Sequence, residues 1–247
     1  NIKKVPNNQS WNTIEKFFKN NKAPTLSQLI NLVRSFNIDI TNDSFIIQKY
    51  LMDWANNKGT AIGLCRPKSS IECGIIVRCF YKYRMKYTIC AGQTALTGSS
   101  CPSGGFVISL EKMTKPSAKL ELVKETIDVP VGIYLEHLRN QVEEQSNGKL
   151  IYPVDPTSRN EAMVGGTLSC NASGFTPGDA GATRHWVNGI DFILPNGYGF
   201  YAERGQYISF NSTFSFKSDK KLTTFKIPTY IRPKIKNASG PYSSNGG

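Results

Sequence analysis

The chain is poor in histidine: His137 and His185 are the only two among its 247 residues. Nucleophilic and general-base mechanisms need a base held beside a nucleophile. With two histidines, the chain offers few such arrangements. His137 falls on the polar side of a predicted helix, and His185 follows a glycine-rich loop beside Trp186. We interpret His137 as solvated and His185 as a hydrogen-bonded loop residue. The motifs G-x-S-x-G and H-E-x-x-H and the P-loop are also missing, so the sequence predicts no catalytic residue.

Long apolar runs are missing as well. A membrane-spanning helix needs about 18 or more consecutive apolar residues, and the sequence has no such run. Hydrophobic residues make up 39% of the chain and charged residues 19%, which is typical of a globular protein. The first residue is Asn1 rather than methionine, which fits either removal of a signal peptide or a trimmed chain. Five N-x-S/T sequons leave glycosylation open.

Acidic residues are scarce relative to basic ones. The sequence has 18 Asp and Glu against 30 Lys and Arg, which gives a net charge of +12. The excess lies in two segments: 66–86 carries six cations against one acid, and 217–236 carries seven against one. If the two segments are neighbours in space, they form one basic patch that attracts acidic partners.

Zinc-binding cysteine pairs are absent, although the chain has six cysteines. No C-x₂-C spacing occurs, and both histidines lie far from the cysteine cluster. An even and clustered count favours disulfide bonds and an oxidising compartment. We therefore predict that all six are oxidised, with a Cys65–Cys73 pair, a Cys90–Cys101 pair across a Gly/Ser/Thr-rich loop, and a long-range bond between the remaining two. The six are Cys65, Cys73, Cys79, Cys90, Cys101 and Cys170.

Residues 77–90 alternate between apolar and cationic side chains, which predicts a long strand with one aromatic face and one basic face. On that strand Lys82, Arg84 and Lys86 would form a straight row of positive charge about 13 Å long. A solvated sheet face is the plainer interpretation, and a site for a polyanion is the functional one. The residues predicted to bind an anionic partner are Arg78, Lys82, Arg84, Lys86, Lys220, Lys221 and Lys226.

The pattern changes along the chain. Residues 10–57 read as three short amphipathic helices, for which packing is a better explanation than a helix-turn-helix DNA reader. From about residue 61 strands dominate, with a strand at 106–113, one helix after Pro130 and a hairpin around Pro195-Asn196-Gly197. We predict a helical region over 1–60 and a β-rich domain over 61–247, with a sub-boundary near 150–165. The predicted fold is α+β and mainly β: an antiparallel, sandwich-like domain stapled by disulfides.

These features favour an exported, non-enzymatic binding or structural protein, such as an adhesin or a pilus-associated subunit. It would be secreted or displayed at the cell surface, with no cofactor or metal, and would bind an anionic glycan or an acidic protein surface or assemble with itself. The first alternative is a viral coat protein in a virion, whose basic surface faces nucleic acid. The second is a secreted toxin or enzyme that uses His185.

Overall fold

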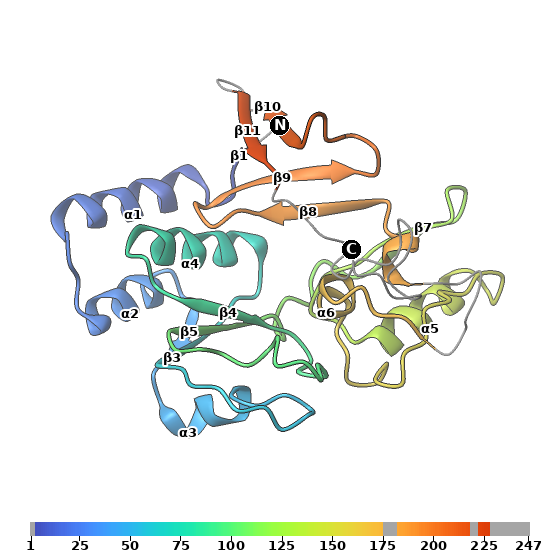
Figure 1. The fold of residues 1–247 in the computed structure, drawn as a ribbon, viewed down its shortest axis with the longest axis horizontal. Helices are drawn as coiled ribbons and strands as arrows, with labels where there is room; N and C mark the ends of the chain where they lie inside the picture. The colour runs from blue at the N-terminus through green and yellow to red at the C-terminus, as the bar shows by residue number, and fades with distance from the viewer. Residues whose placement is uncertain (1–2, 175–181, 218–221, 228–247) are drawn as a thin grey trace.

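The computed structural model describes residues 3–174, 182–217 and 222–227. Its centre is a four-stranded mixed sheet in the order β2-β3-β5-β4 (Figure 1). β3 pairs with β2 in antiparallel fashion, while β5 pairs in parallel with both β3 and β4. The four strands are β2 (Asp39–Thr41), β3 (Gly63–Arg66), β4 (Tyr87–Cys90) and β5 (Phe106–Ser109).

Helix α4 (Ser70–Lys82) is the central packing element and lies between this sheet and a second one (Figure 1). Its first turn is capped by the Ser69 hydroxyl, which accepts a hydrogen bond from the Glu72 N–H group. Phe80 is fully buried, and its ring lies 4.6 Å from that of Phe106 on β5. The helix therefore joins the two layers of the core.

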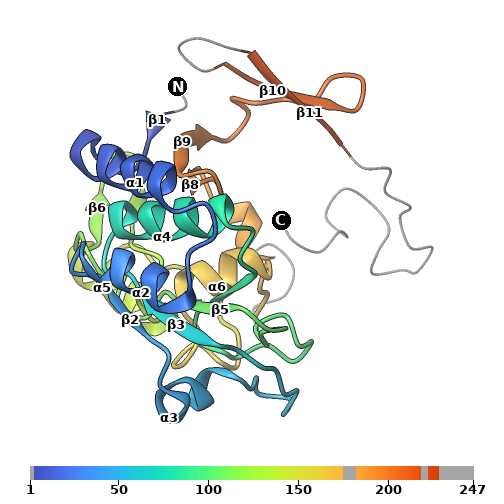
Figure 2. The same cartoon turned by 90° about the vertical axis from the view of Figure 1, so that its left-hand side faces the viewer.

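Two N-terminal helices pack beside α4 (Figures 1 and 2). α1 (Asn8–Asn20) buries Trp11, Ile14 and Phe18 along one face, at the spacing expected of an amphipathic helix. α2 (Leu26–Arg34) begins with a capping box formed by Thr25 and Gln28. Two short turns follow, α3 (Ser44–Ile47) and the 3-10 helix η1 (Gln48–Tyr50).

The second sheet has the order β1-β9-β8. The predicted hairpin is confirmed, because β8 and β9 pair in antiparallel fashion on either side of the turn at 195–197. The ribbon of β10 and β11 stands away from both sheets (Figure 2). These strands are β1 (Lys3–Lys4), β8 (Gly189–Ile193), β9 (Tyr198–Glu203), β10 (Thr213–Lys217) and β11 (Leu222–Lys226).

The remaining elements lie between β5 and β8 in the sequence. The ribbon of β6 and β7 precedes helix α5, which buries Leu135, Leu138 and Val142. Helix α6 and the 3-10 helix η3 follow α5 along the chain. Their bounds are β6 (Lys119–Glu121), β7 (Thr126–Asp128), α5 (Leu135–Gln145), α6 (Val164–Ser169) and η3 (Thr183–Trp186). Within the described residues, no helix has the length and apolar character needed to cross a membrane.

The prediction of one strand over 77–90 was wrong, because residues 77–82 form the end of α4 and only residues 87–90 form a strand, β4. The helix stops at Lys82, and Arg84 turns the chain with a φ of 52°. Both sides of α4 meet other elements, so its buried face is wide and no clean helical period remains in the sequence. The S-x-x-E capping signature at Ser69 was the local signal for a helix.

The predicted antiparallel sandwich stapled by disulfides was also wrong. The central sheet is mixed and is covered by helices, and all six cysteines are free thiols. Four of them, Cys65, Cys73, Cys79 and Cys90, are buried in the apolar core, where they pack as small hydrophobic side chains.

Candidate functional site

The candidate site is built around the loop of residues 91–105, which connects the parallel neighbours β4 and β5. Parallel neighbours are usually joined by a helical crossover, and this connection has no helix among its described residues. Its far end is fixed to the segment directly before β3. The Thr60 and Ile62 N–H groups donate to the carbonyls of Pro102 and Gly105, at 2.8 and 2.7 Å.

The loop presents a run of unused backbone donors. Among the described residues, no acceptor takes the N–H groups of residues 92–97 or those of Ser99 and Ser100. The hydroxyl of Ser100 is buried and has no partner there either. Successive free N–H groups on a non-regular backbone form a concave site for anions such as phosphates. The loop therefore has the donor set that a phosphate-bearing ligand needs.

Glycines allow a second segment to approach this loop. A Cβ atom on Gly92 would lie 2.1 Å from the carbonyl oxygen of Glu161, so only glycine fits that backbone contact. A Cβ atom on Gly166, in the first turn of α6, would lie 3.2 Å from the Cβ atom of Ala91. The segment that precedes α6 thus lies directly against the start of the loop, although the two are about 70 residues apart in sequence.

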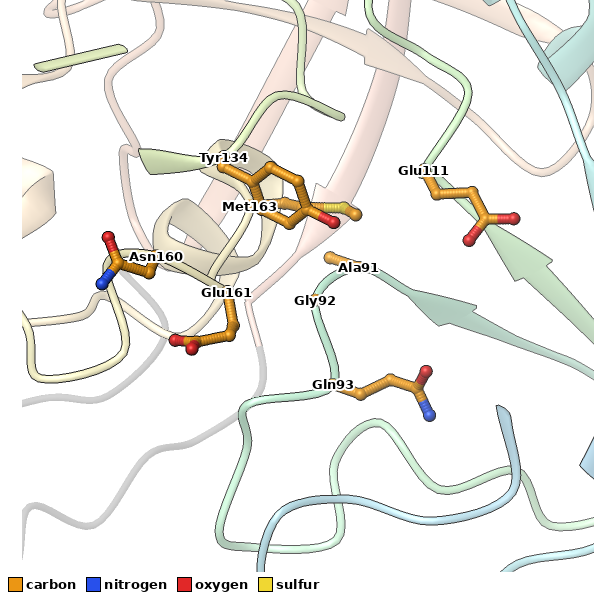
Figure 3. A pocket seen from close by; sticks show the side chains of 8 residues that line it. All are labelled: Ala91, Gly92, Gln93, Glu111, Tyr134, Asn160, Glu161 and Met163. Atoms are coloured by element: carbon orange, nitrogen blue, oxygen red, sulfur yellow. The ribbon is translucent and has the colours of Figure 1, made fainter. Parts of the chain in front are cut away.

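A pocket of about 300 Å³ opens between the loop and this segment (Figure 3). Tyr134 and Met163, which form an isolated antiparallel bridge, lie together at one end of it. Glu111 and Glu161 approach from opposite sides. The lining residues are Ala91, Gly92, Gln93, Glu111, Tyr134, Asn160, Glu161 and Met163. Two carboxylates and several amide and hydroxyl groups suit a ligand part that carries hydroxyl or amine groups rather than phosphate.

The Glu111 side chain is held by residues behind the pocket. It accepts a hydrogen bond of 2.7 Å from the Tyr50 hydroxyl and forms an ion pair of 3.5 Å with Arg66. Burial raises the pKa of Tyr50 well above its usual value, and the nearby carboxylate of Glu111 raises it further. Tyr50 therefore stays protonated and remains a donor to Glu111.

The structure separates the cations that the sequence grouped together. Arg78 is half-buried, forms an ion pair of 2.6 Å with Glu15 and lies 4.9 Å from the ring centre of Trp11. Lys82 lies over the ring of Phe18 at the end of α4. Because a helix and a turn replace the predicted strand, Lys82, Arg84 and Lys86 do not form a straight row. Arg84 and Lys86 are exposed on either side of the turn into β4.

Three further lysines were predicted to bind the same anionic partner. Lys226 is exposed on β11, and Lys220 and Lys221 lie outside the described residues. Their binding role stays a prediction. Cys65, Cys73, Cys79, Cys90, Cys101 and Cys170 form no disulfide. Of the proposed residues that the structure describes, none lines the pocket.

Sequence reasoning missed the loop itself. Residues 91–100, AGQTALTGSS, were interpreted only as a Gly/Ser/Thr-rich loop flanked by a disulfide pair. A glycine-containing loop directly after a strand is also a signal for phosphate binding. Its partner, the pair Gly165-Gly166, gave no local sign that it would lie beside Ala91.

Comparison with known proteins gives the family. The family profile described as "FAD binding domain" matches residues 61–199, more than half of the chain. The D-2-hydroxyglutarate dehydrogenase of Xanthomonas citri pv. viticola is 30% identical over 153 residues, which cover 61% of this chain and 32% of that protein. The glycolate oxidase subunit GlcD of Bacillus subtilis is 25% identical over 170 residues, covering 69% and 35%. The chain thus spans about a third of these relatives' lengths.

Solved structures share the fold at lower sequence identity. Alkyldihydroxyacetonephosphate synthase superposes with a TM-score of 0.63 at 18% identity, over 74% of this chain and 35% of that one. The predicted adhesin or surface-assembly subunit, the coat-protein alternative and the non-enzyme assignment were therefore wrong.

The loop with its free donors and the segment packed against it both fall inside the matched residues, and the fold agrees with that of the solved structures. The chain belongs to the FAD binding domain family.

Proposed function

We propose that this chain binds FAD and forms the cofactor-binding part of a flavin-dependent oxidoreductase that acts on a 2-hydroxy acid. The observation that carries the proposal is the run of unused N–H groups in loop 91–105, inside the family match. Bound FAD would supply the hydride acceptor for oxidation of the substrate.

Two groups of residues suit two different parts of FAD. The unused donors of residues 92–97 and the buried Ser100 hydroxyl suit the diphosphate. The pocket beside them, with Glu111 and Glu161, suits hydroxyl-bearing or amine-bearing parts of the dinucleotide, because two carboxylates would repel phosphate. Gly92 keeps the loop close enough to Glu161 for one ligand to touch both.

The substrate class comes from the relatives. The proteins from Xanthomonas and Bacillus are named for 2-hydroxyglutarate and for glycolate, which are both 2-hydroxy acids. The shared chemistry, a hydroxyl carbon next to a carboxylate, is what we propose for this chain.

Titration of the purified chain with FAD tests the proposal. Quenching of flavin fluorescence and calorimetry should give saturable binding of one FAD per chain. Riboflavin, which lacks phosphate and adenosine, should bind much more weakly because it cannot use the loop donors. A chain that is folded by circular dichroism but gives no saturable FAD signal would refute the proposed function.

The substrate class needs a separate measurement. The natural full-length protein should reduce an artificial electron acceptor in the presence of 2-hydroxyglutarate, glycolate or lactate. Activity with oligosaccharides and none with any 2-hydroxy acid would contradict the proposed substrate class while leaving FAD binding intact.

A further inference from the structure

Asp53 is a buried carboxylate outside the pocket, and only 4% of its surface is exposed. Its Oδ1 accepts hydrogen bonds of 3.0 Å from the N–H groups of both Ala55 and Asn57. Its Oδ2 accepts from the Asn57 side-chain amide at 3.0 Å and from the Gly98 N–H group at 2.8 Å. Hydrogen bonds, first of all from the Asn57 side chain, hold the pKa of Asp53 below its usual value. Asp53 is therefore ionised at neutral pH.

The bond to Gly98 reaches across to the cofactor loop. Gly98 has a φ of 77°, a conformation that glycine adopts without strain, and it directly follows the free donors of residues 92–97. Within the described residues no lysine or arginine forms an ion pair with Asp53, so its charge is balanced by these N–H donors. A buried carboxylate without a cationic partner raises the free energy of the folded state unless each of its hydrogen bonds is kept.

Neighbours of Asp53 hold the same loop. We call residues 49–57 the clamp. The Trp54 N–H group donates to the Ala95 carbonyl at 3.2 Å. The Gln93 side chain donates to the carbonyls of Lys49 and Met52, at 3.1 and 2.9 Å. The clamp thus contacts the loop at Gln93, Ala95 and Gly98, which lie within and directly after the run of free donors.

We propose that Asp53 is a positioning residue for the cofactor: by taking the Gly98 N–H group it holds the free donors of residues 92–97 in an anion-binding arrangement. This inference rests on the proposed function. The loop has no regular structure of its own, so without the clamp its ordering would oppose binding. With the clamp, that conformational entropy is lost when the protein folds.

A direct contact between Asp53 and FAD does not explain these observations. A carboxylate repels a diphosphate, and all five hydrogen bonds to Asp53 come from the chain itself. Asp53 must therefore act through the loop, and its loss should change cofactor affinity more than it changes the fold.

The substitution Asp53→Asn tests this. The amide oxygen can still accept from the backbone N–H groups of Ala55 and Asn57. The amide nitrogen would face two donors, the Gly98 N–H group and the Asn57 side-chain amide. The matched control is Glu15→Gln on α1, which also removes a carboxylate bonded to another element, in this case to Arg78. Each variant is compared with the wild-type chain by FAD titration, thermal unfolding and hydrogen exchange of peptides covering residues 91–102.

We expect Asp53→Asn to raise the Kd for FAD at least tenfold and to speed amide exchange in the unliganded loop. Glu15→Gln should leave the Kd within twofold and the loop exchange unchanged. If Asp53→Asn binds FAD within twofold of the wild type, or leaves loop exchange unchanged, the inference is overturned and the proposed function stands. A wild-type chain that does not bind FAD overturns both, whatever the exchange data show.

Discussion

Single atoms decide how close loop 91–105 can come to its neighbours. At Gly92 the obstacle to a side chain is the backbone oxygen of Glu161, which cannot rotate away as a flexible side chain would. At Gly166 the neighbour is the methyl group of Ala91, at the milder distance of 3.2 Å. A methyl group at Gly92 should therefore destabilise the protein more than one at Gly166.

Gly92→Ala should therefore separate the loop from residues 160–163 and weaken FAD binding at least tenfold. Overpacking of this kind typically costs about 1–3 kcal/mol of stability. Gly166→Ala is the graded control and should have a smaller effect on both quantities. FAD titration measures the affinity of the two variants and urea unfolding measures their stability. Equal effects of the two substitutions would contradict the steric argument.

The cysteines show a second residue-scale effect. Burial raises the pKa of Cys73 to about 11 and those of Cys79 and Cys90 to about 12. At pH 8 the thiolate fraction of these buried thiols is then about one in a thousand or less. Cys101 and Cys170 are more exposed.

An Ellman titration at pH 8 should thus find Cys101 and Cys170 reacting first in the folded protein, and six thiols after unfolding without a reductant. Alanine at Cys101 and Cys170 together should remove the fast phase. Fewer than six thiols in the unfolded, unreduced chain would restore the disulfide hypothesis.

At the scale of elements, an ionic cluster joins the strands of the central sheet. The carboxylate of Asp39 on β2 contacts Arg66 on β3 at 2.9 Å, and it also pairs with Lys112, just after β5. Partial burial acts to raise the pKa of Asp39, but the hydrogen bonds from Lys112 and Arg66 outweigh it, so the pKa is lowered. The cluster holds together strands that are distant in sequence.

The lowered pKa gives a pH dependence with a definite sign. In the unfolded chain Asp39 titrates near its usual value of about 3.9. Its contribution to stability is then complete above that pH and is lost as the pH falls through the lower folded value. Urea unfolding at pH 6, 4 and 3 should show a smaller loss for Asp39→Asn than for the wild type. Asp191→Asn, an exposed carboxylate on β8, is the control and should follow the wild type.

On the scale of the whole molecule, the question is where the cations behind the net charge of +12 lie. Arg78 is used within the fold by Glu15 and Trp11, and much of the basic segment 217–236 lies outside the described residues. Whether the two basic segments form one patch stays a prediction, as does the secreted or cell-surface location. We propose that Arg84 and Lys86, both exposed, take part in binding an anionic partner surface.

The double substitution Arg84→Glu and Lys86→Glu should lower the salt concentration at which the protein elutes from heparin. Exposed charges act over about 8 Å at physiological salt, so the effect should vanish at high salt. Lys16→Glu with Lys19→Glu, on the exposed face of α1, makes the same charge change elsewhere. Equal shifts for the two pairs would mean that only net charge matters.

The sequence by itself determined the features that depend on a few neighbouring residues. The hairpin at Pro195-Asn196-Gly197 and the helix after Pro130 follow from local sequence signals, and the structure contains both. The strand predicted at 106–113 is present in part, as β5. Net charge, too, is a property of the sequence alone.

Tertiary structure decided the rest. Residues 70–82 are a helix because α1, α2 and both sheets pack around them, and contacts with distant elements outweigh the strand preference of a β-branched, aromatic segment. The cysteines cluster in sequence, but four of the six are buried in the core as free thiols and none is joined to another. The position of loop 91–105 depends on the contacts of Gly92 with Glu161 and of Asp53 with Gly98, which join segments tens of residues apart.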